Sequence, residues 1–214
     1  MEVYGYWGVI NKYCIWVLKF IYTNVLWLAF SILGLGALGL APSTTALFAV
    51  QRQWIRGETE IPVFKYFWNY YKSSFIKSNF LFYIMMLLGW IIYFDLKFFM
   101  ARDGLIFQTI SLLLFILSIW YMIVFVYLFP IFIHFELSLL QYIRFACIVG
   151  LLHPFNTIIM LITVGLIYYF MLLFPNFFYL GGISLLTYCI MLFSYKCFNS
   201  DKLIKAKTLK RDSK

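Results

Sequence analysis

Long uninterrupted apolar runs dominate the pattern of residues along the chain. Five of these runs are long enough to cross a bilayer, because about 20 apolar residues in a helix span ~30 Å of hydrocarbon. Only Pro175 and Asn176 separate the last two runs, and one helix over both would be too long for a bilayer even when tilted. We therefore expect a tight helical hairpin there. The predicted spans are residues 15–40, 79–99, 105–130, 154–174 and 177–198.

Shorter amphipathic segments lie between the predicted spans. Residues 42–57 open with Pro42, which suits a first helical turn, and end at Gly57. Residues 62–77 predict a basic, aromatic helix lying on lipid headgroups, and residues 137–150 carry a weaker polar stripe. The aromatic side of the segment 62–77 consists of Phe64, Phe67, Trp68, Tyr71 and Phe75 at helical spacing.

The pattern as a whole predicts an all-α fold, a polytopic transmembrane helical bundle with about five spans and two or three short amphipathic interfacial helices. We expect a single membrane domain over residues 1–214 with a basic cytoplasmic tail at 199–214. Residues 58–100 and 134–175 also suggest a weak internal repeat, because each has an acid, Glu60 or Glu136, before an interfacial helix that leads into a span.

The composition supports a membrane protein. Of the 214 residues, 64% are hydrophobic, 23% are aromatic and only 12% are charged. Soluble domains carry about 25% charged residues because their surface must face water. These values exclude a soluble globular protein, a disordered chain and a disulfide-stapled scaffold.

The basic residues indicate an orientation in the membrane. The net charge of +9 comes from 17 basic and 8 acidic residues that flank the apolar runs, so we expect no nucleic-acid partner. Thirteen basic residues fall on one side of the five-span arrangement, and the other four are Lys12, Lys19, Lys97 and Arg102. The excess predicts an outside N-terminus and a cytoplasmic C-terminus, and it argues against a crossing by residues 42–57.

Few residues point to catalysis. Gly34, Gly36 and Gly39 match a dinucleotide-binding spacing, but no strand precedes them, so close helix packing and a backbone break before Pro42 explain them better. A metal site would require His134, Glu136 and His153 to converge, and polar anchoring at the membrane edge is the alternative. The middle of each span lacks an ionisable residue. We expect no enzyme activity, no cofactor and no metal.

Polar and aromatic residues within the spans leave two interpretations open. Asn24 is the only amide well inside the first span, and Trp27, Trp90 and Trp120 fall near the middle of theirs. Asn24 forms either a hydrogen bond between helices or part of a polar site. The tryptophans either pack against helices and lipid or stack on sugar rings.

Several of these residues belong to a pattern that resembles the YesL family (domain of unknown function 624). The resemblance covers nearly the whole chain. It implies a bacterial integral membrane protein that is often encoded beside carbohydrate ABC importers and polysaccharide-degrading enzymes, and it supplies no catalytic residues. The matching positions include Asn24, Trp27, Ser31, Gly36, Gly39, Ala41-Pro42-Ser43-Thr44-Thr45, Arg52, Trp54, Arg56-Gly57-Glu58, Phe67-Trp68, Tyr127, Pro130, Phe135-Glu136, Ala146 and His153-Pro154.

Three functions follow as hypotheses. The first is a non-enzymatic accessory or regulatory component of carbohydrate (oligosaccharide) ABC import in the bacterial cell membrane, with transporter subunits and anionic lipid headgroups as partners. The second is a small facilitator for a neutral solute such as a sugar, for which five spans favour a homo-oligomer. The third is an intramembrane enzyme. The candidate positions are Asn24, Trp27, Pro42, Thr45, Arg52, Arg56, Glu58, His134, Glu136 and His153.

Overall fold

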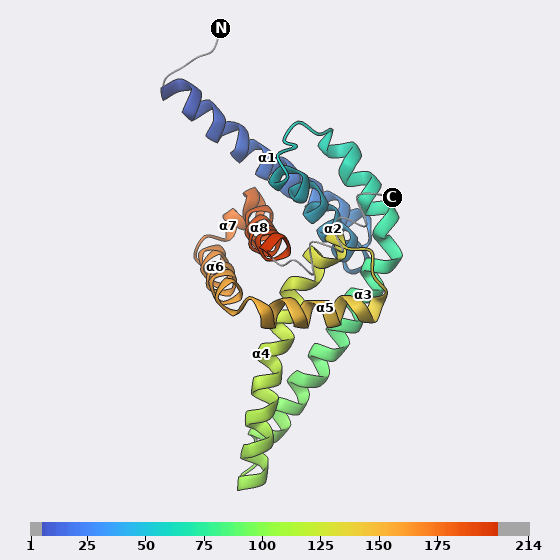
Figure 1. Ribbon diagram of the computed structural model, residues 1–214, viewed down its shortest axis with the longest axis vertical. Helices are drawn as coiled ribbons and strands as arrows, with labels where there is room; N and C mark the ends of the chain where they lie inside the picture. The colour runs from blue at the N-terminus through green and yellow to red at the C-terminus, as the bar shows by residue number, and fades with distance from the viewer. Residues whose placement is uncertain (1–5, 201–214) are drawn as a thin grey trace.

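The computed structural model describes residues 6–200, which form helices joined by short connections (Figure 1). No strand occurs within this range. The predicted all-α fold is therefore confirmed. In chain order the elements are α1 (Tyr6–Leu33), α2 (Ala37–Ile55), α3 (Val63–Met100), α4 (Leu105–His134), α5 (Leu139–Leu152), α6 (Pro154–Leu173), α7 (Pro175–Phe177), η1 (Phe178–Gly182) and α8 (Ile183–Ser200).

Five helical segments are long and apolar enough to cross a membrane, as the sequence predicts. They are Ile10–Leu33, Val63–Met100, Leu105–His134, Pro154–Leu173 and Pro175–Ser200. Between 17% and 33% of the most apolar window of each segment is buried inside the protein. Exposed apolar side chains of this extent suit a lipid surrounding, because no water-soluble fold of this size could leave so many uncovered.

The helices form two regions of different shape. The α3–α4 hairpin extends along the longest axis and projects away from the other elements, whereas α1, α2, α6 and α8 gather at its opposite end (Figure 1). The short helix α5 packs against the last part of α4. The region with α1, α2, α6 and α8 contains most of the contacts between elements distant in sequence.

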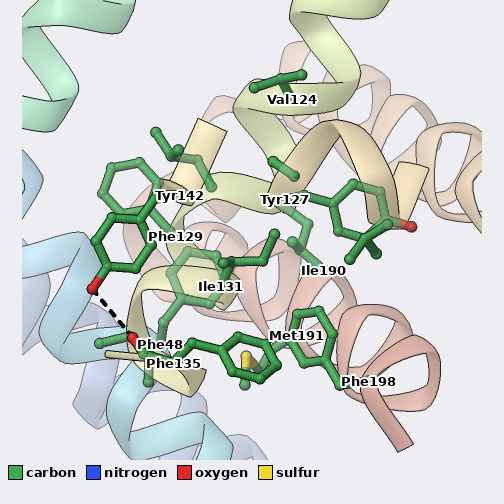
Figure 2. Close-up of a cluster of buried hydrophobic side chains, with 14 of the residues drawn as sticks. Phe48, Val124, Tyr127, Phe129, Ile131, Phe135, Tyr142, Ile190, Met191 and Phe198 are labelled. Atoms are coloured by element: carbon green, nitrogen blue, oxygen red, sulfur yellow. Dashed lines mark hydrogen bonds between the residues drawn. The ribbon is translucent and has the colours of Figure 1, made fainter. Parts of the chain in front are cut away.

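The main core joins α2, α3, α4, α5, α6 and α8, and Figure 2 shows part of it. Phe48 of α2 stacks on Phe129 of α4, with ring centroids 6.1 Å apart. The hydroxyl of Tyr142 donates a hydrogen bond of 3.2 Å to the carbonyl of Phe135, which fixes α5 to the connection after α4. A second core, around Phe30 and Phe67, joins α1, α2 and α3.

The first span ends earlier than its apolar pattern predicts. The helix stops at Leu33, and the chain reverses through Leu35 and Gly36, whose φ angles are 60° and 70°. Pro42 lies inside α2 and not in its first turn, so that prediction is wrong. Residues 37–40 are as apolar as the helix before them, and hydropathy therefore cannot locate this turn.

Gly34 and Gly39 have the packing role that the sequence predicts, and Gly36 lies at the predicted backbone break. A Cβ atom on Gly34 would lie 2.4 Å from the Cα of Gly39, and a Cβ on Gly39 would lie 2.4 Å from the carbonyl oxygen of Ser31. Only glycine allows the end of α1 and the start of α2 to approach so closely. Gly36 supplies the positive φ of the reversal.

The predicted headgroup helix at 62–77 is not a separate element. It is the first part of α3, which continues without a break for 38 residues. Phe67 and Tyr71 are buried, and their ring centroids lie 5.3 and 5.1 Å from that of Phe30 on α1. The aromatic side thus packs on protein, although Phe64 and Trp68 stay exposed. An amphipathic pattern by itself does not distinguish a lipid surface from a neighbouring helix.

The third short helix is confirmed as α5, residues Leu139–Leu152. Its capping box uses Ser138 and Gln141, two of the polar residues of the predicted stripe. The two halves of the predicted repeat have different helices. The first half contains one unbroken helix, α3, whereas the second contains two, α5 and α6, which meet at His153. The duplication stays a prediction.

The position of Lys19 corrects the count of charges on the two sides of the membrane. α2 runs back along α1, so that Trp54 meets Trp16 edge to face at 5.7 Å. The ammonium group of Lys19 donates a hydrogen bond of 2.8 Å to the carbonyl of Thr59. Lys19 and the loop after α2 therefore lie side by side, and counting Lys19 opposite Arg56 is wrong.

Candidate functional site

The last predicted span is broken near its beginning. The single turn α7 and the irregular turns of η1 precede α8, and Gly181 has an extended φ of 170°. A Cβ atom on Gly182 would lie 2.6 Å from the terminal methyl carbon of Met171, so the break packs closely on α6. A helix break inside an apolar region leaves backbone groups that need polar partners.

Asn24 of α1 supplies those partners. Its side-chain amide nitrogen donates hydrogen bonds to the carbonyls of Phe178 (3.0 Å) and Tyr179 (2.8 Å). Its amide oxygen accepts one from the backbone N–H of Ser184 (3.3 Å). Asn24 is 0% exposed. Of the two interpretations of this residue, the structure supports a hydrogen bond between helices.

Further hydrogen bonds extend from Asn24 to α2 and α8. The hydroxyls of Thr23 and Ser184 lie 3.0 Å apart. Gln51 donates to the carbonyl of Ser184 (2.8 Å) and the hydroxyl of Thr187 (2.9 Å). We call Thr23, Asn24, Gln51, Ser184 and Thr187 the polar network; all five side chains are buried. None of them titrates near neutral pH, so the network can fix helices in place but cannot exchange protons.

A second polar joint surrounds Pro42. Proline has no N–H, so the carbonyl of Leu38 lacks its usual donor in α2. The side-chain amide of Asn79 on α3 donates to this carbonyl at 2.9 Å. Trp27 of α1 donates from its indole N–H to the hydroxyl of Thr44 at 3.0 Å. These contacts join α1, α2 and α3.

Thr45 and Arg52 are both buried in α2. The hydroxyl of Thr45 donates to the carbonyl of Ala41 at 2.8 Å within the helix. The guanidinium Nε of Arg52 donates to Nδ1 of His134 at 3.3 Å, which requires a neutral imidazole with its proton on Nε2. The ring centroid of His134 lies 4.8 Å from that of Phe198, so this pair joins the ends of α2, α4 and α8.

The remaining candidate positions lie outside the polar network. Arg56 and Glu58 are exposed after α2, and Glu136 is exposed between α4 and α5. His153 is half-buried where α5 meets α6. Within residues 6–200, no three His, Cys, Asp or Glu side chains are grouped so that they could hold a metal ion. The structure thus does not assemble His134, Glu136 and His153 into such a site.

Sequence reasoning missed five residues of these joints. Thr23, Gln51, Ser184 and Thr187 belong to the polar network, and Asn79 completes the joint at Pro42. Their signal is that each is an uncharged polar residue in or beside an apolar run. The sequence cannot show which of them meet, because Gln51 and Ser184 are 133 positions apart.

An apolar cavity of about 330 Å³ lies between α6 and the broken helix. Its lining includes Tyr168, Met171, Phe178 and Tyr179, and neither Asn24 nor the three mid-span tryptophans take part. Trp90 is instead 62% exposed on α3. Asn24 and the three tryptophans, which could have formed a sugar site, therefore do not line this cavity.

Comparison with known proteins identifies relatives for almost the whole chain. The family model "Protein of unknown function, DUF624" matches residues 20–96, which cover the second half of α1, all of α2 and most of α3. The uncharacterized protein YteU of Bacillus subtilis (strain 168) is 34% identical over 195 residues, or 91% of this chain and 87% of YteU. No solved structure shows significant similarity to the chain.

Two further proteins of the same organism have similar coverage. The uncharacterized protein YesV is 31% identical over 86% of this chain and 89% of YesV. The uncharacterized protein YesL is 29% identical over 89% of this chain and 90% of YesL. The matched region contains Asn24, Gln51 and the joint at Pro42. The chain therefore belongs to the DUF624 family, to which the sequence pattern assigned it.

Proposed function

We propose that this membrane protein is a non-enzymatic accessory or regulatory component of carbohydrate import by an ABC transporter. It would act in the bacterial cytoplasmic membrane, with its basic C-terminal tail in the cytoplasm. The gene neighbourhoods that the YesL resemblance implies support the association with importers. The excess of basic residues after the last span supports the cytoplasmic position of the tail.

The observation that carries this proposal is how the polar side chains within the apolar helices are used. Asn24, Gln51 and Trp27 are buried, and each donates to a group on another helical element. A solute pathway would need such groups to face an open cavity. Their use in contacts between helices favours a protein that acts by binding partners.

Exposed apolar side chains on the long helices α3 and α4 provide a surface to which a partner could bind. Ile91 and Phe115, on α3 and α4, are 50% and 53% exposed. The membrane subunits of an importer could cover such side chains, and Lys65 and Lys72 on the exposed side of α3 could bind anionic lipid headgroups at about 1 kcal/mol each.

Co-purification from native membranes tests the proposal. We expect affinity-tagged protein in a mild detergent to recover importer subunits, and deletion of the gene to reduce oligosaccharide uptake. Recovery of no importer subunit, together with unchanged uptake after deletion, would contradict the accessory role. A tagged membrane protein of another family is the control for non-specific recovery.

One observation favours the alternative of a facilitator for a neutral solute. Transporters often use helices that are interrupted inside the membrane, and the segment α7–η1–α8 is interrupted at Gly181. Flux into proteoliposomes separates the two functions. Sugar entry above that of empty vesicles would favour the facilitator, whereas the accessory role predicts no entry.

A further inference from the structure

The tip of the α3–α4 hairpin carries two charges of each sign. Asp95 and Lys97 lie in the last turns of α3, and Arg102 and Asp103 lie in the connection to α4. All four side chains are exposed. Within the described range none of the four forms an ion pair, although their charges would balance. The tip is therefore electrostatically self-complementary but unpaired.

Aromatic rings hold both cations at this surface. The ammonium of Lys97 lies 5.2 Å from the ring centroid of Tyr93. The guanidinium carbon of Arg102 lies 4.1 Å from the ring centroid of Phe98. These cation–π contacts fix the cations in position and leave both carboxylates for another partner.

An exposed apolar row leads from the tip along α3. Tyr83, Leu87, Trp90 and Phe94 are 40%, 63%, 62% and 53% exposed. Their spacing of four, three and four residues is the repeat by which two helices pack side by side along a seam. Figure 1 shows that this part of the hairpin projects beyond the other helices, which leaves room for a second helix.

We propose that a second copy of this chain packs on this row, with a two-fold axis between the two α3 helices. In a two-fold interface, if residue i of one copy contacts residue j of the other, then residue j of the first copy contacts residue i of the second. Asp95 and Asp103 of one copy would face Lys97 and Arg102 of the second. Anionic lipid headgroups could pair only with the cations and would repel the carboxylates, whereas a second copy satisfies both signs. This inference does not rest on the proposed function.

Charge-matched variants test this interface in intact membranes. Two differently tagged copies are co-expressed, and recovery of the second with the first is measured. Asp95→Asn with Asp103→Asn makes the tip positive, and Lys97→Gln with Arg102→Gln makes it negative. We expect wild-type copies to co-purify. When both tagged copies carry the same charge-removing variant, recovery of the second copy should fall about tenfold, because attraction between several charge pairs becomes repulsion. Mixing the positive with the negative variant should restore recovery to the wild-type level.

The control Lys65→Gln with Lys72→Gln removes two positive charges from the other end of α3, and it should leave recovery unchanged. All variants only remove charge, so none adds a positive residue to the hairpin that could reverse the membrane orientation. Equal recovery of a uniform tip with itself, or no rescue in the mixed pair, would overturn the proposal. Failure of wild-type copies to co-purify would also overturn it, and would mean that lipid or another protein covers this row.

Discussion

Asn24 illustrates how one side chain can support a helix break in an apolar surrounding. Its amide has two donors and an acceptor, and the backbone around η1 presents two carbonyls and one N–H to it. Alanine would leave these backbone groups without that partner. Because water is scarce in such a region, the cost of a lost hydrogen bond is a large part of the effect.

We therefore expect Asn24→Ala to lower the free energy of unfolding by about 1–2 kcal/mol. Thermal unfolding of the purified protein in a mild detergent measures this. Thr163→Ala is a matched control, since the Thr163 hydroxyl is exposed and bonds only within α6. Equal melting temperatures for the two variants would contradict the role of Asn24.

Pro42 and Asn79 should be energetically coupled. Asn79→Ala removes the donor to the carbonyl of Leu38, which we expect to cost about 1 kcal/mol. In a Pro42→Ala background, the new N–H of residue 42 can donate to that carbonyl, so Asn79→Ala should cost less. A double-mutant cycle of thermal stability should give a coupling of at least about 0.5 kcal/mol. Additive effects would show that Asn79 does not compensate for the proline.

The sequence predicted that the side chain of Asn24 has a polar partner, but it did not predict which group that partner is. An isolated amide in an apolar helix is visible without a structure, as is Pro42. The partner of Asn24 is the backbone of residues 178 and 179, which has no signal in side-chain chemistry. The burial of Arg52, which is 5% exposed beside His134, likewise depends on a partner that is 82 positions away in the sequence.

The turn between α1 and α2 shows what hydropathy can and cannot predict for whole elements. The pattern identified all five long apolar helices, because exposure to lipid requires apolar side chains over a full span. It did not find the reversal at Gly36, where apolar residues continue through the turn. It also divided α3 in two, because its first part is more polar than its second.

Gly39 offers a test of the close approach between α1 and α2. Gly39→Ala would place a methyl group 2.4 Å from the carbonyl oxygen of Ser31. We expect a loss of about 1–3 kcal/mol or more, measured as thermal stability. Gly165→Ala on α6 is the matched control, because no atom lies within 4 Å of the added carbon and alanine favours a helix. Equal stability of the two variants would show that the helices are further apart.

For the whole molecule, the contact between Lys19 and Thr59 bears on how the chain enters the membrane. Lys19 lies near the middle of α1 and contacts the loop between α2 and α3, because α2 runs back along α1. We therefore expect Lys12 and this loop to lie on the same side of the membrane, whereas the charge count predicts opposite sides. The sequence count could not detect it, because the count treats α2 as a segment that stays on one side.

Cysteine accessibility tests this arrangement. In a variant with Cys14, Cys147, Cys189 and Cys197 replaced by serine, a single cysteine is placed at Lys12 or at Glu60, both of which are exposed. A membrane-impermeant maleimide reaches the outer face in intact cells and the cytoplasmic face in inverted vesicles. We expect it to label both positions in the same one of these two preparations. Labelling from opposite sides would instead support the prediction from the charge count.

The polar network holds the broken last helix against α1, and its Thr23–Ser184 contact joins residues 161 positions apart in the sequence. Thr23→Cys with Ser184→Cys, in the cysteine-free background, tests it most directly, because the two native hydroxyl oxygens are 3.0 Å apart. We predict that mild oxidation of intact membranes forms an intramolecular disulfide, detected by mass spectrometry, whereas Thr163→Cys with Ser184→Cys does not. No disulfide in the first pair would contradict the claim.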